Sequence, residues 1–277
     1  MDQATLYKQE QNYLDKKNKI ILRNLKSTLD LDVDEYFNKL KAYFKNIDKV
    51  LIDSNICSNF SLDTIDYILK QGEEEIKTKI PALLTKYVSY LERASCLIKN
   101  DKRICTTENI VKELTDCDAA NKSYLGHLRY LINEIYEDRL ISRKIAKETS
   151  NLMKEKIRTM CNLAYDIANL LHPRSVEEHN HYKNKLNSLF NLDYISENDK
   201  NLVCTFIKES KRKKSIIMSK DNDIKDLLKI LSENRDVVKK KLQIPRIDLF
   251  YQILNYPPYT TIGYCSIEYP KQFSRKQ

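Results

Sequence analysis

The side chains best suited to metal chemistry gather between residues 172 and 181, where three of the four histidines lie beside two glutamates. Glu178 and His181 are three residues apart, the spacing that places a carboxylate and an imidazole on one helix face in di-iron bundles. Such bundles need a second Glu-x-x-His pair, and this sequence has none. His179 and His181 would point to different faces of a helix. The pattern therefore favours a polar helix start, and we expect no metal and no cofactor.

The densest basic run consists of Lys211, Arg212, Lys213 and Lys214. Such a run fits a nuclear import signal or a contact with an acidic surface, including nucleic acid. It lies in a segment with helical spacing, where a basic run is also typical of a solvated face. We therefore treat these four residues as a candidate partner-binding site.

Residues that could act as nucleophiles have no catalytic context along the sequence. The seven cysteines form no Cys-x-x-Cys pair, and none has a histidine placed locally to activate it. We interpret them as small buried hydrophobes of a reducing compartment. No Ser/His/Asp or paired-carboxylate arrangement stands out, although groups distant in sequence can meet in space. Only three glycines occur and they lie far apart, which excludes a glycine-rich nucleotide loop. We predict that the protein is not an enzyme.

The composition is that of long amphipathic helices. Charged residues make up 31% of the chain, hydrophobic residues make up 42%, and the mean hydropathy is -0.58. The net charge of +9 permits attraction to nucleic acid, acidic protein surfaces or anionic lipid without demanding any of them. No apolar run is long enough to span a bilayer, and the first residues contain no apolar core of a secretory signal. We expect a cytoplasmic or nuclear location.

Apolar residues recur at helical spacing along most of the chain. One stripe runs from Val33 to Leu51, and Asp32 with Glu35 forms its capping box. Two further proline-free runs cover residues 107–172 and 196–244. The fold class predicted from this pattern is all-α, an elongated helical bundle with coiled-coil-like long helices and about 70% helix. We divide the chain into an N-terminal helical segment (1–105), a long-helix region (106–244) and an extended tail (245–277).

The tail is rich in proline and in aromatic residues. Its tyrosines combine an apolar face with a hydroxyl, which suits a partly wet groove. The tail could lie back across the bundle as a strap, pair its β-prone stretch 259–262 with the sheet edge of a partner, or bind nothing. We treat four of its tyrosines as candidate partner-binding residues, namely Tyr251, Tyr256, Tyr259 and Tyr264.

The function expected from these features is that of a structural or adaptor subunit in an intracellular assembly of cytoskeletal, spindle or trafficking type. Its partners would be other helical subunits of a hetero-oligomer, bound through amphipathic helices and the tail. The alternative is a nucleic-acid-associated protein that uses the basic helix face around Lys211–Lys214. A third possibility is an enzyme whose site is the histidine cluster at 172–181.

Overall fold

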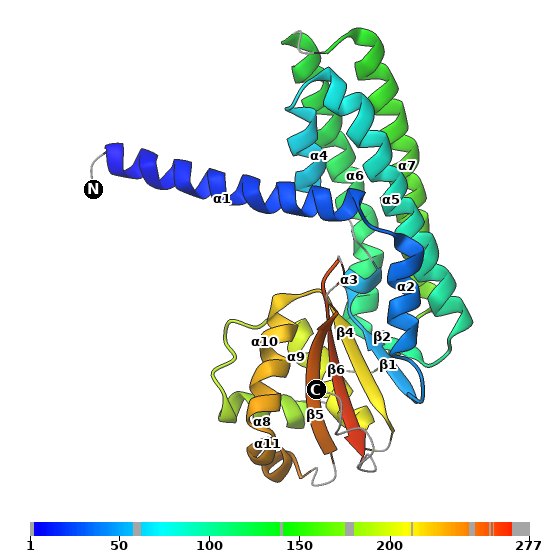
Figure 1. Ribbon diagram of the computed structural model, residues 1–277, viewed down its shortest axis with the longest axis vertical. Coiled ribbons are helices and arrows are strands. Elements are labelled where there is room, and N and C mark those ends of the chain that lie inside the picture. Colours follow the sequence, from blue (N-terminus) through cyan, green and yellow to red (C-terminus); the bar gives the residue numbers. More distant parts are fainter. Residues whose placement is uncertain are drawn as a thin grey trace.

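The computed structural model describes residues 3–57, 62–138, 141–174, 180–211, 213–243, 247–254, 256 and 258–267. Helix makes up 71% of the chain, close to the predicted 70%. The prediction of an all-α coiled-coil bundle is nevertheless wrong, because the described residues also form a six-stranded mixed sheet (Figure 1). The sheet takes strands from all three segments into which the sequence was divided.

The strand order of the sheet is β3-β2-β1-β4-β6-β5. Strands β1 to β4 are parallel to one another, whereas β6 runs antiparallel to both β4 and β5. The chain steps from β1 to β2 to β3 on one side of β1 and then returns to place β4 on the other side. The direction of the connections therefore reverses between β1 and β4. The strands are β1 (Lys49–Ile52), β2 (Ile104–Thr107), β3 (His172–Arg174), β4 (Ser215–Ser219), β5 (Ile247–Leu254) and β6 (Thr260–Ile267).

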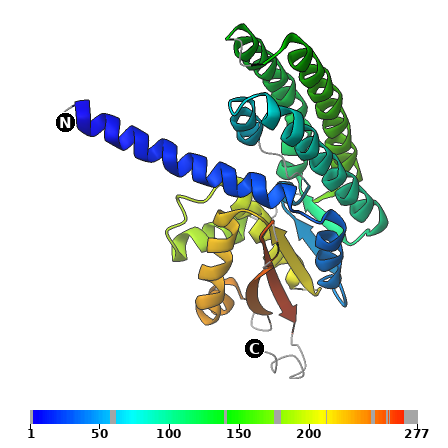
Figure 2. The ribbon, with the colours of Figure 1, turned by 45° about the horizontal axis from the view of Figure 1, so that its top comes forward.

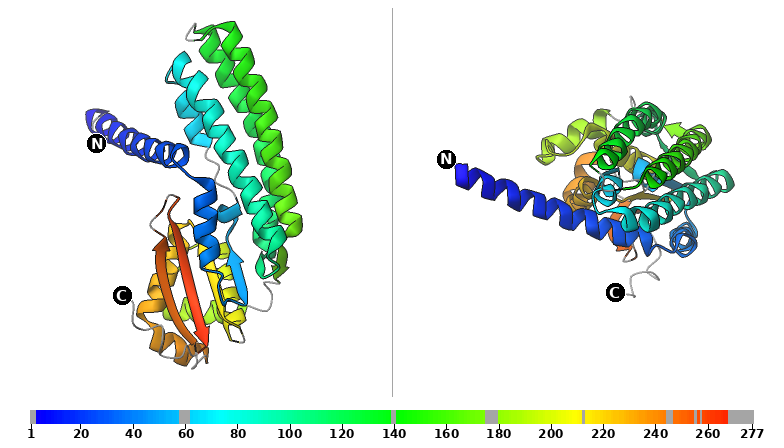
Figure 3. Two further views of the ribbon diagram at one scale, coloured as in Figure 1. Left: turned by 45° about the vertical axis from the view of Figure 1, so that its right-hand side comes forward. Right: turned by 90° about the horizontal axis from the view of Figure 1, so that it is seen from above.

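The helices fall into three groups (Figures 1 and 3). Helices α9 and α10 pack on one face of the sheet, with α8 and α11 beside them. On the other face α2 and α5 cover β1 and β4, where Phe37, Leu97 and Met218 meet around a small cavity. Helices α5, α6 and α7 also pack together into a rod that extends beyond the sheet, and α1 projects from the body (Figures 1 and 2). The bounds are α1 (Gln3–Leu29), α2 (Val33–Ala42), α3 (Ser54–Cys57), α4 (Leu62–Leu69), α5 (Glu73–Asn100), α6 (Glu108–Glu137), α7 (Arg143–Leu170), α8 (Asn180–Leu189), α9 (Glu197–Ser210), α10 (Asn222–Glu233) and α11 (Arg235–Leu242).

The central strands are short apolar runs that helical spacing also fits. Residues 50–52 in β1 and all of β4 are buried, as is usual for a parallel sheet covered on both faces. The sequence pattern assigned Val50 and Leu51 to a helical stripe and Ile217 to a heptad position. A run of three or four apolar residues satisfies both periods, so packing against neighbouring strands decides the structure.

The segment after Pro245 is part of the sheet where it is described, which corrects its prediction as a non-helical tail outside a helical bundle. Strands β5 and β6 form a hairpin with eight paired positions, and β6 adds to β4 of the same chain. The stretch 259–262 thus pairs in cis, with Thr261 opposite Ser219 and Ile262 opposite Met218. The buried hydroxyl of Tyr36 lies 2.7 Å from Oγ1 of Thr260, which joins the hairpin to α2.

Gly263 allows α10 to pack closely on β6, and this packing yields a stability prediction. A Cβ at this position would lie 2.7 Å from Cγ2 of Ile217 and 2.8 Å from Cδ2 of Leu228. Gly263→Ala should therefore lower the free energy of unfolding by about 1–3 kcal/mol, the usual cost of overpacking a core. Gly126→Ala is the matched control, because a Cβ there meets nothing within 4 Å. In a helix this control should gain about 0.5–1 kcal/mol. Urea titration followed by circular dichroism measures both, and equal stability of the two variants would contradict the packing.

Candidate functional site

Polar side chains converge at the edge of the sheet where the parallel strands end. Asp53 directly follows β1, and Asp221 comes two residues after β4. These two strands are neighbours at the point where the connections reverse, the place where open α/β sheets bind their ligands. Helices α6 and α10 start at this edge because they follow β2 and β4. Helix α9 also starts here, since it runs back to the beginning of β4.

The carboxylate of Asp53 joins the ends of β1 and β4. Its Oδ2 accepts hydrogen bonds from Oγ of Ser219 at 2.5 Å and from Nδ2 of Asn55 at 2.6 Å. Its Oδ1 accepts from the backbone N–H of Ser54 at 2.7 Å. Burial raises the pKa of Asp53, the hydrogen bonds oppose this rise, and the negative charges of Asp221 and Glu113 add to it. The side chain is thus held in a fixed orientation although its charge is disfavoured.

A second carboxylate comes from the start of α6. Glu113 accepts a short hydrogen bond from Nδ2 of Asn198, in the first turn of α9. Oδ1 of the same asparagine accepts from Nδ2 of Asn109 at 3.0 Å. Asn198 therefore joins the first turns of α6 and α9 and holds Glu113 in place.

Three further carboxylates complete what we call the acidic cluster: Asp53, Glu113, Asp199, Asp221 and Asp223. Asp199 accepts a hydrogen bond from Oγ of Ser196 at 2.7 Å, and Asp221 caps α10 by accepting from the N–H of Asp223 at 2.8 Å. Burial raises the pKa of Asp199 to about 6, and the charges of Asp53, Asp221 and Asp223 contribute to this rise against the Ser196 hydrogen bond. Asp53 thus feels the charges of Glu113 and Asp221, and Asp199 feels those of Asp53, Asp221 and Asp223.

Two buried oxygen atoms at this edge have no hydrogen-bond partner among the described residues, namely Oγ1 of Thr107 and Oδ1 of Asn201. Continuing the β1–β2 register places Thr107 beside Asp53. Ile52 points to the α2 and α5 face, so strand alternation directs Asp53 and Thr107 to the face that α9 covers. Thr107 is the N-cap residue of α6, yet its hydroxyl makes no capping bond. Unsatisfied buried polar atoms are costly, which indicates that a ligand or water binds here.

Three lysines are adjacent in sequence to members of the cluster: Lys112 precedes Glu113, Lys200 follows Asp199, and Lys220 lies between Ser219 and Asp221. The ammonium of Lys220 donates to the hydroxyl of Tyr90 at 3.1 Å and lies 4.5 Å from the centroid of that ring. Burial lowers the pKa of Lys220 to about 7, against smaller opposing effects of Cys57 and Asp53. The hydroxyl of Tyr90 thus receives the Lys220 ammonium, and the buried ammonium of Lys200 donates to Glu197 at 3.2 Å at the start of α9.

The arrangement suits a cation that keeps much of its water. Within the described residues, no three acidic, histidine or cysteine side chains are grouped closely enough to hold a metal ion by themselves. Mg²⁺ is usually bound through one or two carboxylates, with waters and substrate phosphates completing its shell. Asp53 supplies one such carboxylate at this edge, and the charges of Asp221 and Glu113 act on it.

The histidine cluster of the sequence is not brought together as a site in the described part of the chain. His172 is exposed in β3 and His181 is exposed in α8. Glu178 and His179 lie outside the described residues.

The basic run lies at the opposite edge of the sheet from the acidic cluster, because it precedes β4. Lys211 and Lys213 are exposed, and the Lys211 ammonium lies 4.8 Å from the ring centroid of Tyr182. The backbone N–H of Lys214 donates to Asp48 at 2.9 Å. Arg212 lies outside the described residues. The role of this run in binding a partner stays a prediction.

The four tyrosines predicted to bind partners are found in or beside the β5–β6 hairpin. Tyr251 and Tyr264 are partly buried on the strands, and the ring centroids of Tyr264 and Tyr43 lie 6.1 Å apart. The hydroxyl of Tyr256 donates to Glu35 at 3.1 Å, and the Lys39 ammonium lies 3.7 Å from its ring centroid. Tyr259 is 60% exposed, so it is the member of this group most accessible to a partner.

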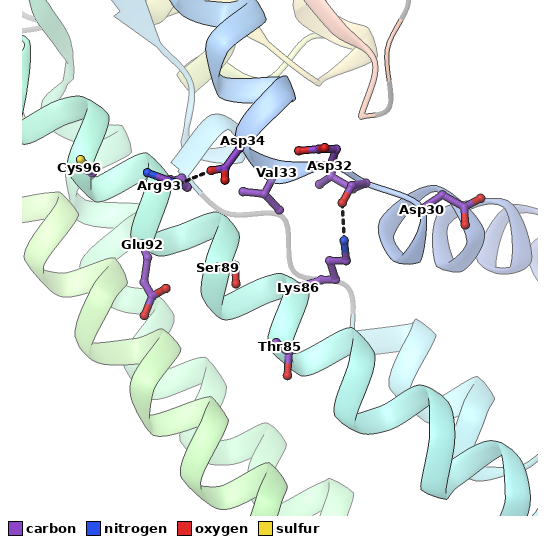
Figure 4. A pocket seen from close by; sticks show the side chains of 11 residues that line it. Asp30, Asp32, Val33, Asp34, Thr85, Lys86, Ser89, Glu92, Arg93 and Cys96 are labelled. Atoms are coloured by element: carbon purple, nitrogen blue, oxygen red, sulfur yellow. Dashed lines mark hydrogen bonds and ion pairs between the residues drawn. The ribbon is translucent and has the colours of Figure 1, made fainter.

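A surface pocket of about 740 Å³ lies between the α1–α2 junction and α5, separate from the acidic cluster (Figure 4). Asp34 forms an ion pair with Arg93 across it, and the ammonium of Lys86 donates to the carbonyl oxygen of Leu31 at 2.5 Å. Its charged groups are thus largely engaged in fixing the junction. We assign no chemistry to it.

Comparison with known protein families, curated sequences and solved structures finds no match for this chain. None of the described helices is both long enough and apolar enough to cross a lipid bilayer. The site must therefore be interpreted from its own geometry.

No sequence pattern singled out the acidic cluster, because its members are scattered between residues 53 and 223. Two segments of the sequence nevertheless carry a pattern that indicates part of this cluster. Residues 49–52 and 215–219 are short β-prone apolar runs, and each is followed within two residues by an aspartate. An aspartate after a buried strand is a candidate ligand at the carboxyl edge of a sheet.

Repulsion within the cluster can be measured by comparing two helix caps. Asp221 and Asp32 both cap a helix through a side-chain oxygen, and asparagine preserves this hydrogen bond. Asp32→Asn should lose about 0.5 kcal/mol of stability, because the helix dipole favours a negative charge there. Asp221→Asn should be neutral or stabilising in EDTA at low salt, since it also relieves repulsion. Urea unfolding measures both, and an equal loss in the two variants would show that the cluster carries no significant repulsion.

Proposed function

We propose that this protein is a divalent-cation-dependent hydrolase that cleaves phosphodiester bonds in nucleic acid. The observation that carries the proposal is the acidic cluster at the point where the connections of the parallel sheet reverse. The unpartnered hydroxyl of Thr107 beside Asp53 is an independent sign that this edge receives a ligand. The sequence-based predictions of a non-enzymatic adaptor and of a cytoplasmic or nuclear location stay predictions.

The residues fit a hard cation such as Mg²⁺ or Mn²⁺, which prefers carboxylate oxygens and water. When bound, the cation would acidify a water molecule and neutralise charge on the phosphate. Asn55 and Ser219 would keep the Asp53 carboxylate turned toward the edge, and Asn198 would hold Glu113 across from it. In the hydrolysis the water oxygen bonds to phosphorus, the phosphorus–oxygen bond to the leaving group breaks, and the leaving oxygen takes up a proton. A carboxylate of the cluster is placed to accept the proton that the water gives up.

A nucleic-acid substrate is supported by the charge of the chain. The protein carries a net charge of +9 although this edge is acidic. A positive field attracts a polyanion and accelerates its association, whereas a bound cation reverses the repulsion at the cluster itself. The proposed function keeps nucleic acid as the partner, as in the alternative drawn from the sequence. It assigns the chemistry to the acidic cluster and not to Lys211–Lys214, which lie at the opposite edge of the sheet.

Hydrolysis can be tested with two substrates, a labelled oligonucleotide and the small diester bis(4-nitrophenyl) phosphate. We expect turnover of both with Mn²⁺ or Mg²⁺ and none in EDTA. Asp53→Asn and Glu113→Gln should lower the rate by about 100-fold, since loss of metal-site groups has effects of that order. Asp226→Asn is the matched control, because Asp226 is an exposed carboxylate of α10 outside the cluster.

A second measurement separates binding from turnover. Mn²⁺ should raise the thermal midpoint of the unmodified protein and of Asp226→Asn, because a ligand of the folded state stabilises it. The rise should be much smaller for Asp53→Asn. Hydrolysis that persists in EDTA, or that falls equally in Asp226→Asn, would refute the proposed function.

A second candidate function, partner binding in a hetero-oligomer, is favoured by the rod of α5, α6 and α7. Tyr130 and Tyr136 on α6 are 66% and 40% exposed, and aromatic residues are enriched at protein interfaces. If a helical subunit binds here, Tyr130→Ser with Tyr136→Ser should abolish its co-purification from the native cell while hydrolysis is unchanged. Tyr194→Ser is the control, as Tyr194 is 57% exposed outside the rod. Co-purification that survives the double substitution would exclude this part of the rod as the binding surface.

A further inference from the structure

Helix α1 is joined to the body along only part of its length (Figures 1 and 2). Ile21, Leu25 and Thr28 are buried where α1 contacts α4 and α5. Residues 12–20 are all exposed. The helix projects beyond the end of the sheet from which α3 and α10 start, which is the edge of the acidic cluster (Figures 1 and 3).

The exposed face of α1 carries a row of cations that we call the basic ridge: Lys16, Lys19, Arg23 and Lys26. Their spacings of three, four and three residues place them on one side of the helix, opposite Ile21 and Leu25. The ridge is about 15 Å long, from a rise of 1.5 Å per residue. Within the described residues, the ion pair of α1 involves Lys17, which lies off this face and pairs with Asp63 at 3.7 Å. Among the described residues the four members of the ridge form no ion pair, although Asp15 and Asp30 each lie four residues from one of them.

The base of α1 is fixed, so the ridge has a defined direction. The residues between α1 and α2 are held by the hydrogen bond from Lys86 to Leu31 and by the ion pair between Arg93 and Asp34 (Figure 4). Asp32 caps α2 by accepting from the N–H of Glu35 at 2.9 Å. These contacts fix the end of α1 nearest to Arg23 and Lys26, whereas Lys16 and Lys19 lie on the exposed part that projects.

We propose that the basic ridge binds the phosphate backbone of a nucleic-acid strand outside the acidic cluster. A row of four cations complements a chain of regularly spaced phosphates, and Asp15 and Asp30 near its two ends offset part of its charge. An anionic membrane is less suitable, because an interfacial helix inserts an apolar face opposite its charges. Over residues 21–28 that face of α1 is already buried against the body, whereas Tyr13, Leu14 and Ile20 are exposed on the part that projects. The role of the ridge in presenting substrate rests on the proposed function, but its binding of nucleic acid does not.

The test is a variant that neutralises the ridge, Lys16→Gln, Lys19→Gln, Arg23→Gln and Lys26→Gln. Its control neutralises four exposed cations of α7: Lys144, Lys147, Lys154 and Arg158. Glu148 and Glu155 share that face of α7, so its charges are already offset. Circular dichroism and the thermal midpoint establish that both variants fold, as exposed substitutions usually change stability by less than about 0.5 kcal/mol.

Binding is measured in EDTA, which prevents hydrolysis, with a labelled single strand of about 20 nucleotides, longer than typical single-strand sites. The ridge variant should bind at least tenfold more weakly than the unmodified protein. The slope of log K against log salt should fall by about 3, because each phosphate that a cation no longer neutralises removes roughly 0.7 from it. The α7 variant should retain both the affinity and the slope. An unchanged slope in the ridge variant, or an equal decrease in the α7 variant, would overturn the proposal.

Two further arms separate the competing explanations. Hydrolysis of bis(4-nitrophenyl) phosphate should be unchanged in the ridge variant, whereas its KM for the oligonucleotide should rise. If the unmodified protein hydrolyses nothing but the ridge variant still loses strand binding, the ridge is supported and the proposed function fails. If the substitutions abolish binding to phosphatidylserine vesicles and leave strand binding intact, the ridge is a lipid-binding surface and our proposal is wrong.

Discussion

A buried carboxylate between two parallel strands is the constraint around which this molecule is organised. Burial disfavours the charge of Asp53, so its oxygens need donors, and these come from Ser54, Asn55 and Ser219. Ser219 can reach Asp53 only if β4 lies directly beside β1. The same hydrogen bond therefore fixes the register of the two strands and brings the starts of α6, α9 and α10 to one edge. An alanine at either position would leave unsatisfied polar groups in the most crowded part of the sheet.

Two buried tyrosines support this arrangement from the face of the sheet that α2 and α5 cover. Tyr36 on α2 hydrogen-bonds Thr260 at the start of β6, and Tyr90 on α5 donates to the carbonyl oxygen of Ile56 at 3.1 Å. Burial raises the pKa of Tyr36 to about 12, so it is neutral at physiological pH. These hydroxyls connect the hairpin, α2 and α3 through an apolar core. The acidic edge is thus held by rigid elements, as a binding site for a small ion requires.

The sequence allowed the helices to be predicted better than the sheet. The helix cap at Asp32 follows from local backbone chemistry, and the structure confirms it. The strands could not be assigned in the same way, because β1 and β4 are four- and five-residue apolar runs that also match helical spacing. Asp199 and Asp221 each look like a first-turn or capping residue on their own. Their shared role depends on a strand order that no local pattern contains.

The long separation between Asp53 and Ser219 has a consequence for synthesis of the chain. The two residues are 166 positions apart, and the rod of α5 to α7 is made in the interval. During translation β1 can pair with β2, but the Asp53 carboxylate lacks its Ser219 donor until β4 has left the ribosome. A nascent chain that ends between α6 and β4 therefore carries Asp53 and Glu113 without the opposing strand. The acidic edge is therefore complete only after β4 and the start of α10 have been synthesised.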